Sequence, residues 1–561
     1  MIILIVFIKV KFMFSSFKYI LLFSLLTMMI LTNCKDQTDK DEHRRVFNYN
    51  EMAGISSLDP AMASNLEIIW PINLLFNGLV QMDDSLHVMP CIAKRWSISH
   101  DGLTYTFTLR NDVYFHDNAC FKNEKGRKIT AHDFVFSFNR LYDTQVSSAL
   151  TLLDNIDKSE KTHYKGFSAL NDTTFTMQLK APFSPFLSIL TMKYFSVIPF
   201  EAIELYGRDF RKNPVGTGPF VFKMWEEGTK LVMLKNNHYF EFEGTKRLPY
   251  LDAVTVSFVK DRETAFMELL NGKYDMLSGA DAFNINEVLD KNGHLKSIYA
   301  AKFNLQKQAF LKTDYLGILI DENMPIVQSS PLKLKAIRKA INYGFDRVKL
   351  IKYFRNNIGF PAIAGFIPVQ LPSYNQNIVK GYEYSPEKVR QLLAEAGFPE
   401  GKGLPEITLH TTENFLEQTE FIQSQLAENN IKINISVDKA SVLKQAVSNC
   451  EYNFYKKSWV GDYPDEENFM GLFYSKNFAP LGFNFTHFKN QEFDRLFELA
   501  IKEQAGETKN ALYQKMDQLL MEEAPIVPLY YDQSIRLVHK NISGFTPNPM
   551  NLLNLKSVQK N

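Results

Sequence analysis

The sequence has few cysteines and no excess charge of either sign. Only 4 cysteines occur in 561 residues, which excludes a fold held together by a dense disulfide framework. The 63 lysines and arginines nearly balance the 62 aspartates and glutamates. Such a chain has no overall field that would concentrate a polyanion, so we expect no nucleic-acid partner.

The sequence also lacks the short motifs that mark common catalytic and metal sites. It contains no HExxH motif, no GxSxG motif and no CxxC pair, and therefore no signature of a zinc protease, a nucleophile elbow or a structural zinc site. Its 11 histidines are scattered along the chain. No pair of carboxylates stands at a spacing typical of a hydrolase. We expect no enzymatic activity, no cofactor and no bound metal.

One glycine-rich stretch, GTGP at residues 216–219, has the composition of a phosphate-binding loop. Its proline has no amide hydrogen, so the stretch lacks a donor where such a loop needs one. We interpret it as a structural turn.

The N-terminus carries the pattern of an export signal. Lysines precede an apolar stretch at residues 19–31, which is shorter than the roughly 20 residues that span a bilayer and suits the core of a signal peptide. A further apolar patch upstream of Met13 leaves Met1 and Met13 as alternative starts. We predict a signal peptide over residues 1–33.

The apolar stretch ends in LTNC at residues 31–34, followed by a polar string. This resembles a bacterial lipobox, in which the cysteine becomes the lipidated first residue, although Asn33 replaces the usual small residue. We therefore expect Cys34 to carry a lipid anchor and residues 34–45 to form a tether. The alternative is an ordinary secretory signal with a chance cysteine.

Beyond the signal, the sequence has no other apolar run of membrane-spanning length, so we expect a water-soluble body. Cys91, Cys120 and Cys450 remain in it. Their odd number excludes complete pairing, and the sequence leaves open whether Cys91 and Cys120 form a disulfide.

The body alternates between strand and helix patterns. Residues 103–110 alternate strictly, with Tyr105, Phe107 and Leu109 on one face, which predicts a half-buried strand. Thr130 and Asp133 then predict a capping box at the start of a helix.

Two further helix starts have serine followed by proline. Ser385 and Pro386 precede an apolar stripe that ends at Gly397, and Ser330 opens a similar helix pattern through Ile341. Strands and helices are interleaved with no repeat of 20 to 50 residues. We expect an α/β fold of two lobes.

Eight motifs follow one another along the chain in the order typical of one family. They are SLDPA (57–61), DGLTYTFTLRNDVYFHD (101–117), ITAHDFVFSFNRL (129–141), NPVGTGPF (213–220), LKAIRKAINYGFDR (334–347), YSPEKVRQLLAEAGF (384–398), WVGDYPDEENF (459–469) and APIVPLYY (524–531). Together they resemble the extracytoplasmic solute-binding proteins of peptide, nickel and opine ABC importers.

The resemblance implies a type II periplasmic-binding-protein fold of the Venus-flytrap kind. Two α/β lobes are joined by a pair of crossing segments, and an extra subdomain, here at about 80–200, is inserted in lobe one. By motif, lobe one is expected over 46–303 and again over 532–561. Lobe two is expected over 304–531.

The resemblance further implies a monomeric receptor on the periplasmic side of the cell envelope. It would capture a short peptide between its lobes and deliver it to an ABC permease in the membrane. Within the family the alternatives are a nickel chelate, an opine or an oligosaccharide. An extracytoplasmic hydrolase is an alternative from another class.

In peptide-binding members, the aspartate of the segment that matches WVGDY receives the ligand's α-ammonium group, which implies Asp462 here. Gly461 belongs to the same candidate site, and Trp459 and Tyr463 are candidate pocket walls. Without the resemblance, the segment would be interpreted as a surface turn. We expect the acidic residues 465–467 to form a solvated rim.

One departure bears on the substrate. Dipeptide binders clamp the ligand carboxylate with an arginine near the start of the helix after the first lobe-two strand. The corresponding residues here, 414–421, contain no arginine. Arg338 and Arg347 are poor substitutes, since both belong to a helical motif. The departure favours longer or modified peptides over strict dipeptides.

Overall fold

The computed structural model describes residues 45–147, 149–159, 166–279 and 283–561. The predicted signal peptide, Cys34 and nearly all of the predicted tether lie outside the described residues and stay predictions. Within the described ranges, no helix has both the length and the apolar character needed to cross a membrane. Phe47–Asn561 forms one compact unit.

A sheet of 11 strands organises this unit. Its strands are β1 (Val46–Asn50), β8 (Phe220–Glu226), β9 (Lys230–Lys235), β12 (Ala253–Ser257), β13 (Met276–Ser278), β14 (Phe303–Ile318), β15 (Phe360–Pro361), β16 (Ile407–Thr411), β17 (Ile433–Val437), β18 (Phe454–Val460) and β19 (Ile526–His539). Their order is β17-β16-β18-β14-β19-β13-β1-β12-β9-β8, with β15 paired to β19. Parallel pairs such as β16 with β17 occur beside antiparallel pairs such as β14 with β18.

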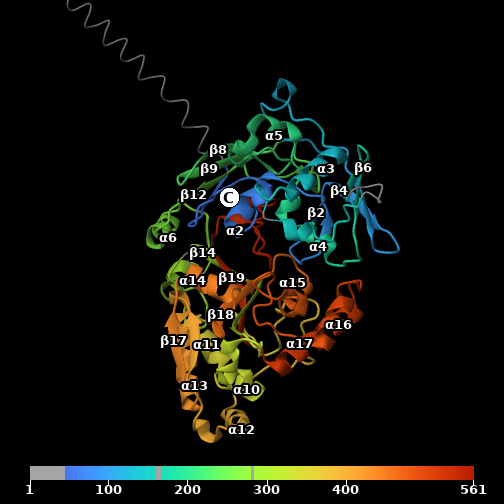
Figure 1. The fold of residues 1–561 in the computed structure, drawn as a ribbon. Coiled ribbons are helices and arrows are strands. Elements are labelled where there is room, and N and C mark those ends of the chain that lie inside the picture. The colour runs from blue at the N-terminus through green and yellow to red at the C-terminus, as the bar shows by residue number, and fades with distance from the viewer. Residues whose placement is uncertain (1–44, 148, 160–165, 280–282) are drawn as a thin grey trace, which may run out of the picture. The chain divides into compact units, whose positions relative to one another are not determined.

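The two longest strands, β14 and β19, connect the two lobes and run side by side (Figure 1). One end of β19 pairs with β13, and one end of β14 pairs with β18. Lobe one here means β1–β13, α2–α8 and the chain after β19, and lobe two means α9–α17 with β15–β18. The predicted boundaries between the lobes stay predictions, because both strands belong to both lobes.

The end of β14, YLGI at residues 315–318, is buried on both faces, which explains its apolar character. Tyr315 packs into one apolar cluster of lobe two, and Leu316 packs into another on the opposite face of the sheet. Successive strand residues point to opposite faces, so a strand covered on both sides needs apolar residues at nearly every position. Asp314 is therefore an exception that requires partners.

A small antiparallel sheet lies apart from the main one, within the region predicted as the extra subdomain. It has the order β4 (Ala93–Ile98), β5 (Thr104–Leu109), β7 (Thr174–Gln178) and β6 (Phe167–Asn171). The predicted alternating strand is confirmed as β5, with Tyr105, Phe107 and Leu109 buried. The predicted capping box of Thr130 and Asp133 is confirmed at the start of the helix Ala131–Asn139, α3.

The remaining elements cover these sheets or join them at turns. The helices of lobe one are α2 (Leu66–Leu75), α3, α4 (Phe186–Ile189), α5 (Phe200–Tyr206), α6 (Arg262–Leu270), α7 (Ile285–Val288) and α8 (Ser297–Ala300). Those of lobe two are α9 (Pro325–Gln328), α10 (Lys335–Tyr343), α11 (Arg347–Phe354), α12 (Pro386–Glu395), α13 (Leu416–Glu428), α14 (Ala440–Ser448), α15 (Glu467–Met470), α16 (Gln491–Ala500) and α17 (Glu507–Glu523). Short strand pairs are β2 (Val80–Met82) with β3 (Val88–Pro90), β10 (Phe242–Glu243) with β11 (Lys246–Arg247), and β20 (Ile542–Ser543) with β21 (Gln559–Lys560).

One of the two predicted serine-proline helix starts is confirmed and the other is wrong. The Ser385 hydroxyl accepts a hydrogen bond from the Lys388 amide at the start of α12. Ser330 instead caps only the 3-10 turn Pro331–Lys333, and α10 begins separately after Leu334. The extended backbone at Leu334 interrupts the helical path, which the apolar spacing alone did not reveal.

Several residues dismissed as ligand groups have structural roles. Arg347 is buried and donates to the carbonyl of Pro528 at 2.6 Å, and buried Arg338 donates to the carbonyl of Leu332 at 2.9 Å. A Cβ atom at Gly216 would lie 2.1 Å from the Leu75 carbonyl oxygen, so this turn requires glycine for close packing.

Cys91, Cys120 and Cys450 are free thiols, so the alternative Cys91–Cys120 disulfide is not formed.

Candidate functional site

A cavity of about 380 Å³ lies where the two lobes meet. Lobe one contributes residues near 63–69, at 82 and at 191–194, and lobe two contributes the segment 460–462. Phe310 and Lys312 of the connecting strand β14, with Met550 and Leu552 of the C-terminal segment, complete the lining. Pockets of roughly 300–1,000 Å³ are typical of small-ligand sites.

An irregularity in β14 places two of these side chains in the cavity. The register between β14 and β19 shifts between Ala309 and Thr313. Within the shifted segment, the Leu311 amide donates to the Pro549 carbonyl at 2.9 Å, and the Leu311 carbonyl accepts from the Gly461 amide at 2.7 Å. The flanking Phe310 and Lys312 line the cavity. Local breaks in strand pairing often re-aim side chains at functional sites in this way.

Asp462 lies two residues after the end of β18 and lines the cavity with Gly461. Its backbone amide donates to the Asn468 side-chain oxygen at 3.1 Å, which fixes the turn. The surrounding protein desolvates the carboxyl and raises its pKa, although a side-chain hydrogen bond with Asn468 opposes the shift. Among the described residues, no cation lies within ion-pair distance of Asp462.

Trp459 and Tyr463, predicted as pocket walls, lie beside this site and do not line the cavity. The Trp459 indole donates to the Asn468 side-chain oxygen at 3.1 Å. Tyr463 is buried, and its hydroxyl donates to the Glu467 carboxylate. Both side chains support the loop that carries Asp462.

The prediction of a solvated rim at residues 465–467 is wrong. Asp465 is buried and accepts from the Lys509 ammonium at 2.6 Å. Glu466 is buried and accepts from the Ser373 amide at 2.9 Å, and burial raises the pKa of Glu467 to about 7. The physical reason is that the loop packs against α17 and the chain near Ser373, contacts between residues distant in the sequence.

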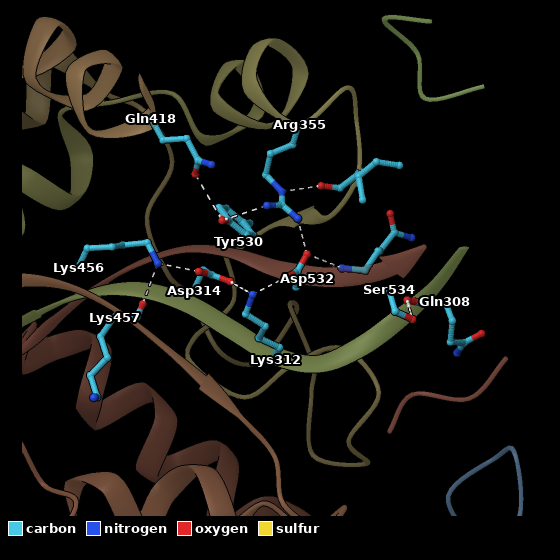
Figure 2. Close-up of polar contacts among 12 residues, drawn as sticks. Gln308, Lys312, Asp314, Arg355, Gln418, Lys456, Lys457, Tyr530, Asp532 and Ser534 are labelled. Carbon is cyan, nitrogen blue, oxygen red and sulfur yellow. Dashed lines mark hydrogen bonds and ion pairs between the residues drawn. The ribbon is translucent and has the colours of Figure 1, made fainter. Parts of the chain in front are cut away.

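A network of five ionisable side chains lies behind the lobe-two side of the cavity. Figure 2 shows Lys312 between two carboxylates, at 3.2 Å from Asp314 and 2.8 Å from Asp532. Lys456 approaches Asp314 at 2.6 Å, and Arg355 pairs with Asp532. The strands β14, β18 and β19 and the end of α11 thus bring together groups that are far apart in the sequence.

The pKa shifts of the network follow from its pairing. Burial alone would lower the pKa of Lys312, but the carboxylates of Asp314 and Asp532 outweigh burial and raise it. Burial would likewise raise the pKa of Asp314, but Lys312 and Lys456 hold it below its usual range. Lys312 and Asp314 are therefore both charged at neutral pH, and each basic group of the network has a carboxylate within ion-pair distance.

A second polar cluster in lobe two contains a thiol beside an imidazole. The Cys450 sulfur lies 3.2 Å from His487 Nε2, and His487 Nδ1 lies 3.1 Å from an Asp321 oxygen. These bonds raise the pKa of His487 to about 9, although burial opposes the shift. None of the three residues lines the interlobe cavity, so the cluster cannot act on a ligand bound there.

The sequence had not pointed to Lys312 or to Lys193, which lines the opposite side of the cavity. A weak signal did exist for Lys312, because Lys312 and Asp314 stand directly before the apolar end of the strand, YLGI at residues 315–318. Nothing in the local sequence distinguishes Lys193. Within the described ranges, no group of His, Cys, Asp and Glu side chains could hold a metal ion.

The chain matches the family model described as bacterial extracellular solute-binding proteins, family 5 middle, over residues 87–480. It is 27% identical to the probable di/tripeptide-binding protein 5 of Pseudomonas aeruginosa, over 85% of this chain and 88% of the relative. It is 28% identical to the glutathione-binding protein GsiB of Salmonella choleraesuis, over 88% of this chain and 90% of the relative. A solved structure of the periplasmic binding protein DppA from Helicobacter pylori, in complex with the peptide STSA, is similar with 26% identity and a TM-score of 0.73, covering 93% of this chain and 99% of that one.

Proposed function

The chain belongs to family 5 of the bacterial extracellular solute-binding proteins, and from that membership we propose that it captures short peptides in its interlobe cavity. As a member of this family it is a non-catalytic, extracytoplasmic component of an ABC importer. The peptide would then pass to a permease in the membrane.

The observation that carries the proposal is the Asp462 carboxylate in the cavity without a cationic partner among the described residues. The Asp462 side chain is exposed, but the surrounding protein raises its pKa, so a cation bound beside it would stabilise the charged carboxylate. The α-ammonium group of a peptide supplies such a cation, with three hydrogen-bond donors. We propose this pairing as the anchor of the ligand's amino end.

Two relatives and one solved structure carry peptide names, which supports this substrate class. They are the di/tripeptide-binding protein, the glutathione-binding protein and the DppA complex with the peptide STSA. The helix arginine of dipeptide binders is absent from residues 414–421. We therefore favour peptides longer than two residues, or modified ones, over strict dipeptides.

The anchor to the membrane is part of the same proposal. LTNC at residues 31–34 supports lipidation of Cys34 and tethering on the periplasmic side of the cell envelope. Cys34→Ser should move the protein from the membrane fraction to the soluble fraction and abolish labelling by a radioactive fatty acid. Persistent acyl labelling of this variant would contradict the anchor.

Incubation with a pool of synthetic di-, tri- and tetrapeptides tests the function. After dialysis, mass spectrometry should find peptide retained at a one-to-one ratio with protein, and the pool should be chemically unchanged. Progressive loss of peptide with appearance of fragments would indicate a hydrolase. Retention of no peptide would point to another solute of the family, such as a nickel chelate or an opine.

A further inference from the structure

Lys193 occupies a fixed position on the lobe-one side of the cavity. It begins the 3-10 turn Lys193–Phe195, whose Tyr194 and Phe195 are buried. The Lys193 carbonyl accepts from the Ser196 hydroxyl at 2.8 Å. Because these contacts hold the backbone, the lysine side chain has a defined origin. It borders both the interlobe cavity and an adjoining cavity of about 50 Å³.

The ammonium group of Lys193 has no hydrogen-bond or ion-pair partner among the described residues. Burial lowers its pKa to about 8; the charge of Lys556 adds to this shift, and Cys91 opposes it. Glu241, an acidic neighbour of Cys91, is already paired, since it accepts from Lys556 at 2.6 Å. Asp83 and Asp84 border the smaller cavity, but neither is within ion-pair distance of Lys193.

Lys193 differs in this respect from Lys312, the other lysine of the interlobe cavity. Lys312 already contacts Asp314 and Asp532. A ligand anion that bound Lys312 would meet those two carboxylates, and like charges in a poorly solvated site repel strongly. Lys193 carries no such neighbours within ion-pair distance, so its positive charge remains available to a ligand.

We propose that the Lys193 ammonium binds a carboxylate of the peptide whose amino end is held by Asp462. The inference rests on the proposed function, because it assumes a peptide in this cavity. Asp462 belongs to lobe two and Lys193 to lobe one, and the two are not within ion-pair distance of each other. A ligand with opposite charges at its ends would therefore contact both lobes and satisfy both groups.

This arrangement gives the ligand a direction and a role in joining the lobes. The amino end lies at β18 and the carboxylate lies at the 3-10 turn of lobe one. A ligand shifts a conformational equilibrium only through its different affinity for the two states. The state with the lobes together offers two charge contacts and a separated state offers one, so the zwitterionic ligand favours the former.

Lys193→Met tests the proposal, because methionine keeps an unbranched apolar stem and removes the charge. Lys223→Met is the matched control, since Lys223 is exposed on β8 and lies outside the cavity. Each protein is offered synthetic tripeptides without acidic side chains, as free acids and as C-terminal amides, and retention is measured by equilibrium dialysis. Thermal unfolding confirms that each variant is folded.

The wild type and Lys223→Met should bind the free acids about tenfold to hundredfold more tightly than the amides, as expected for a charge-assisted hydrogen bond. Lys193→Met should bind both forms equally, at the affinity of the wild type for the amides. A further pool of amides that contain one glutamate identifies the source of the carboxylate. If the wild type retained these glutamate-containing amides and Lys193→Met did not, the inference would also be supported. The carboxylate that binds Lys193 would then come from the glutamate side chain of the peptide.

The Lys193 inference would be overturned if folded Lys193→Met and the wild type showed the same ratio of affinity for the free acids to affinity for the amides in every pool. That result would leave the proposed function intact. Failure of the wild type to retain any peptide from any pool would overturn both.

Discussion

The lysines on the two sides of the interlobe cavity differ in their ion pairing. On the lobe-two side, Lys312 is held between Asp314 and Asp532 inside a network of five ionisable side chains. On the lobe-one side, Lys193 has no such partner among the described residues. A buried charge that is paired contributes to the architecture, whereas one left unpaired destabilises the empty protein and is a candidate to meet a ligand.

Asp462 extends the contrast. Like the network, it lies on the lobe-two side of the cavity. It is not part of the network, because no described cation is within ion-pair distance of its carboxylate. Each lobe therefore presents one unpaired ionisable group to the cavity, an acid from lobe two and a base from lobe one. The difference separates charges that hold the fold from charges that are available to a ligand.

The largest expected effect comes from breaking the network at its centre. Asp314 is fully buried and contacts both Lys312 and Lys456. Asp314→Asn leaves these ammonium groups without their shared anion. The free energy of unfolding should fall by about 3 to 5 kcal/mol, the usual effect of removing one partner of a buried ion pair. Denaturant titration with and without the substitution measures this loss.

The matched control is Asp112→Asn, which removes one partner of an exposed ion pair. Asp112 contacts Arg110 at 2.8 Å, and about half of its side chain is accessible to solvent. Pairs of this kind contribute roughly 0–1 kcal/mol. The loss of stability should therefore be clearly larger for Asp314→Asn. If Asp314→Asn cost no more than Asp112→Asn, the network would not be structural.

A smaller effect of opposite sign is expected on the other side of the cavity. Lys193→Met removes an unpaired, half-buried ammonium group and should stabilise the ligand-free protein by about 1 to 3 kcal/mol at neutral pH. Burial lowers the pKa of this lysine from 10.5 to about 8 in the fold, and the charge of Lys556 adds to the shift. The unfolded chain therefore binds the proton of the Lys193 ammonium group more tightly than the folded chain does.

The pH dependence of this gain follows from linkage. The gain should be complete below pH 8 and should fade as the pH rises from 8 through 10.5, where the unfolded lysine also loses its proton. Thermal unfolding of the wild type and Lys193→Met at several pH values measures it. A variant less stable than the wild type below pH 8 would show that Lys193 is paired.

The smallest effect is expected at His487, where pH alone can remove a paired charge. Its pKa is raised from 6.5 to about 9, first by the Cys450 thiol and then by Asp321. A raised pKa means that the imidazolium stabilises the fold fully below pH 6.5 and that this contribution is lost as the pH rises through 9. His487→Asn should therefore be less stable than the wild type at about pH 6, with a gap that closes by about pH 9.5. A gap that does not change with pH would contradict a charged His487.

The local elements were predictable because their signals are local. The alternation of Tyr105, Phe107 and Leu109 specifies a strand buried on one face, and the Ser385 hydroxyl caps the helix that it precedes. The fold class and the family followed from motifs spread along the chain. The helix start at Ser330 was misplaced because the extended backbone at Leu334 has no distinct sequence signal.

The candidate site was only partly predictable, since distant segments build it. Gly461 and Asp462 were found through the resemblance of one loop, and both line the cavity. Lys193 and Lys312 were missed, because their roles depend on which carboxylates lie nearby in space. Asp465 was misjudged as solvated for the same reason, because its partner Lys509 lies on α17, which is distant in the sequence.

The measurement that tests the central claim most directly is a cycle of calorimetric titrations on Asp462 and the amino group of the ligand. The wild type and Asp462→Asn are each titrated with a peptide retained from the synthetic pool and with its N-acetylated form. Loss of either charge should weaken binding by about two to four orders of magnitude, because breaking a closed ion pair costs about 3 to 5 kcal/mol. If Asp462 holds the amine, the losses are strongly non-additive and Asp462→Asn barely distinguishes the two ligands. Additive losses would show that the amine is bound elsewhere and that Asp462 is only a turn residue.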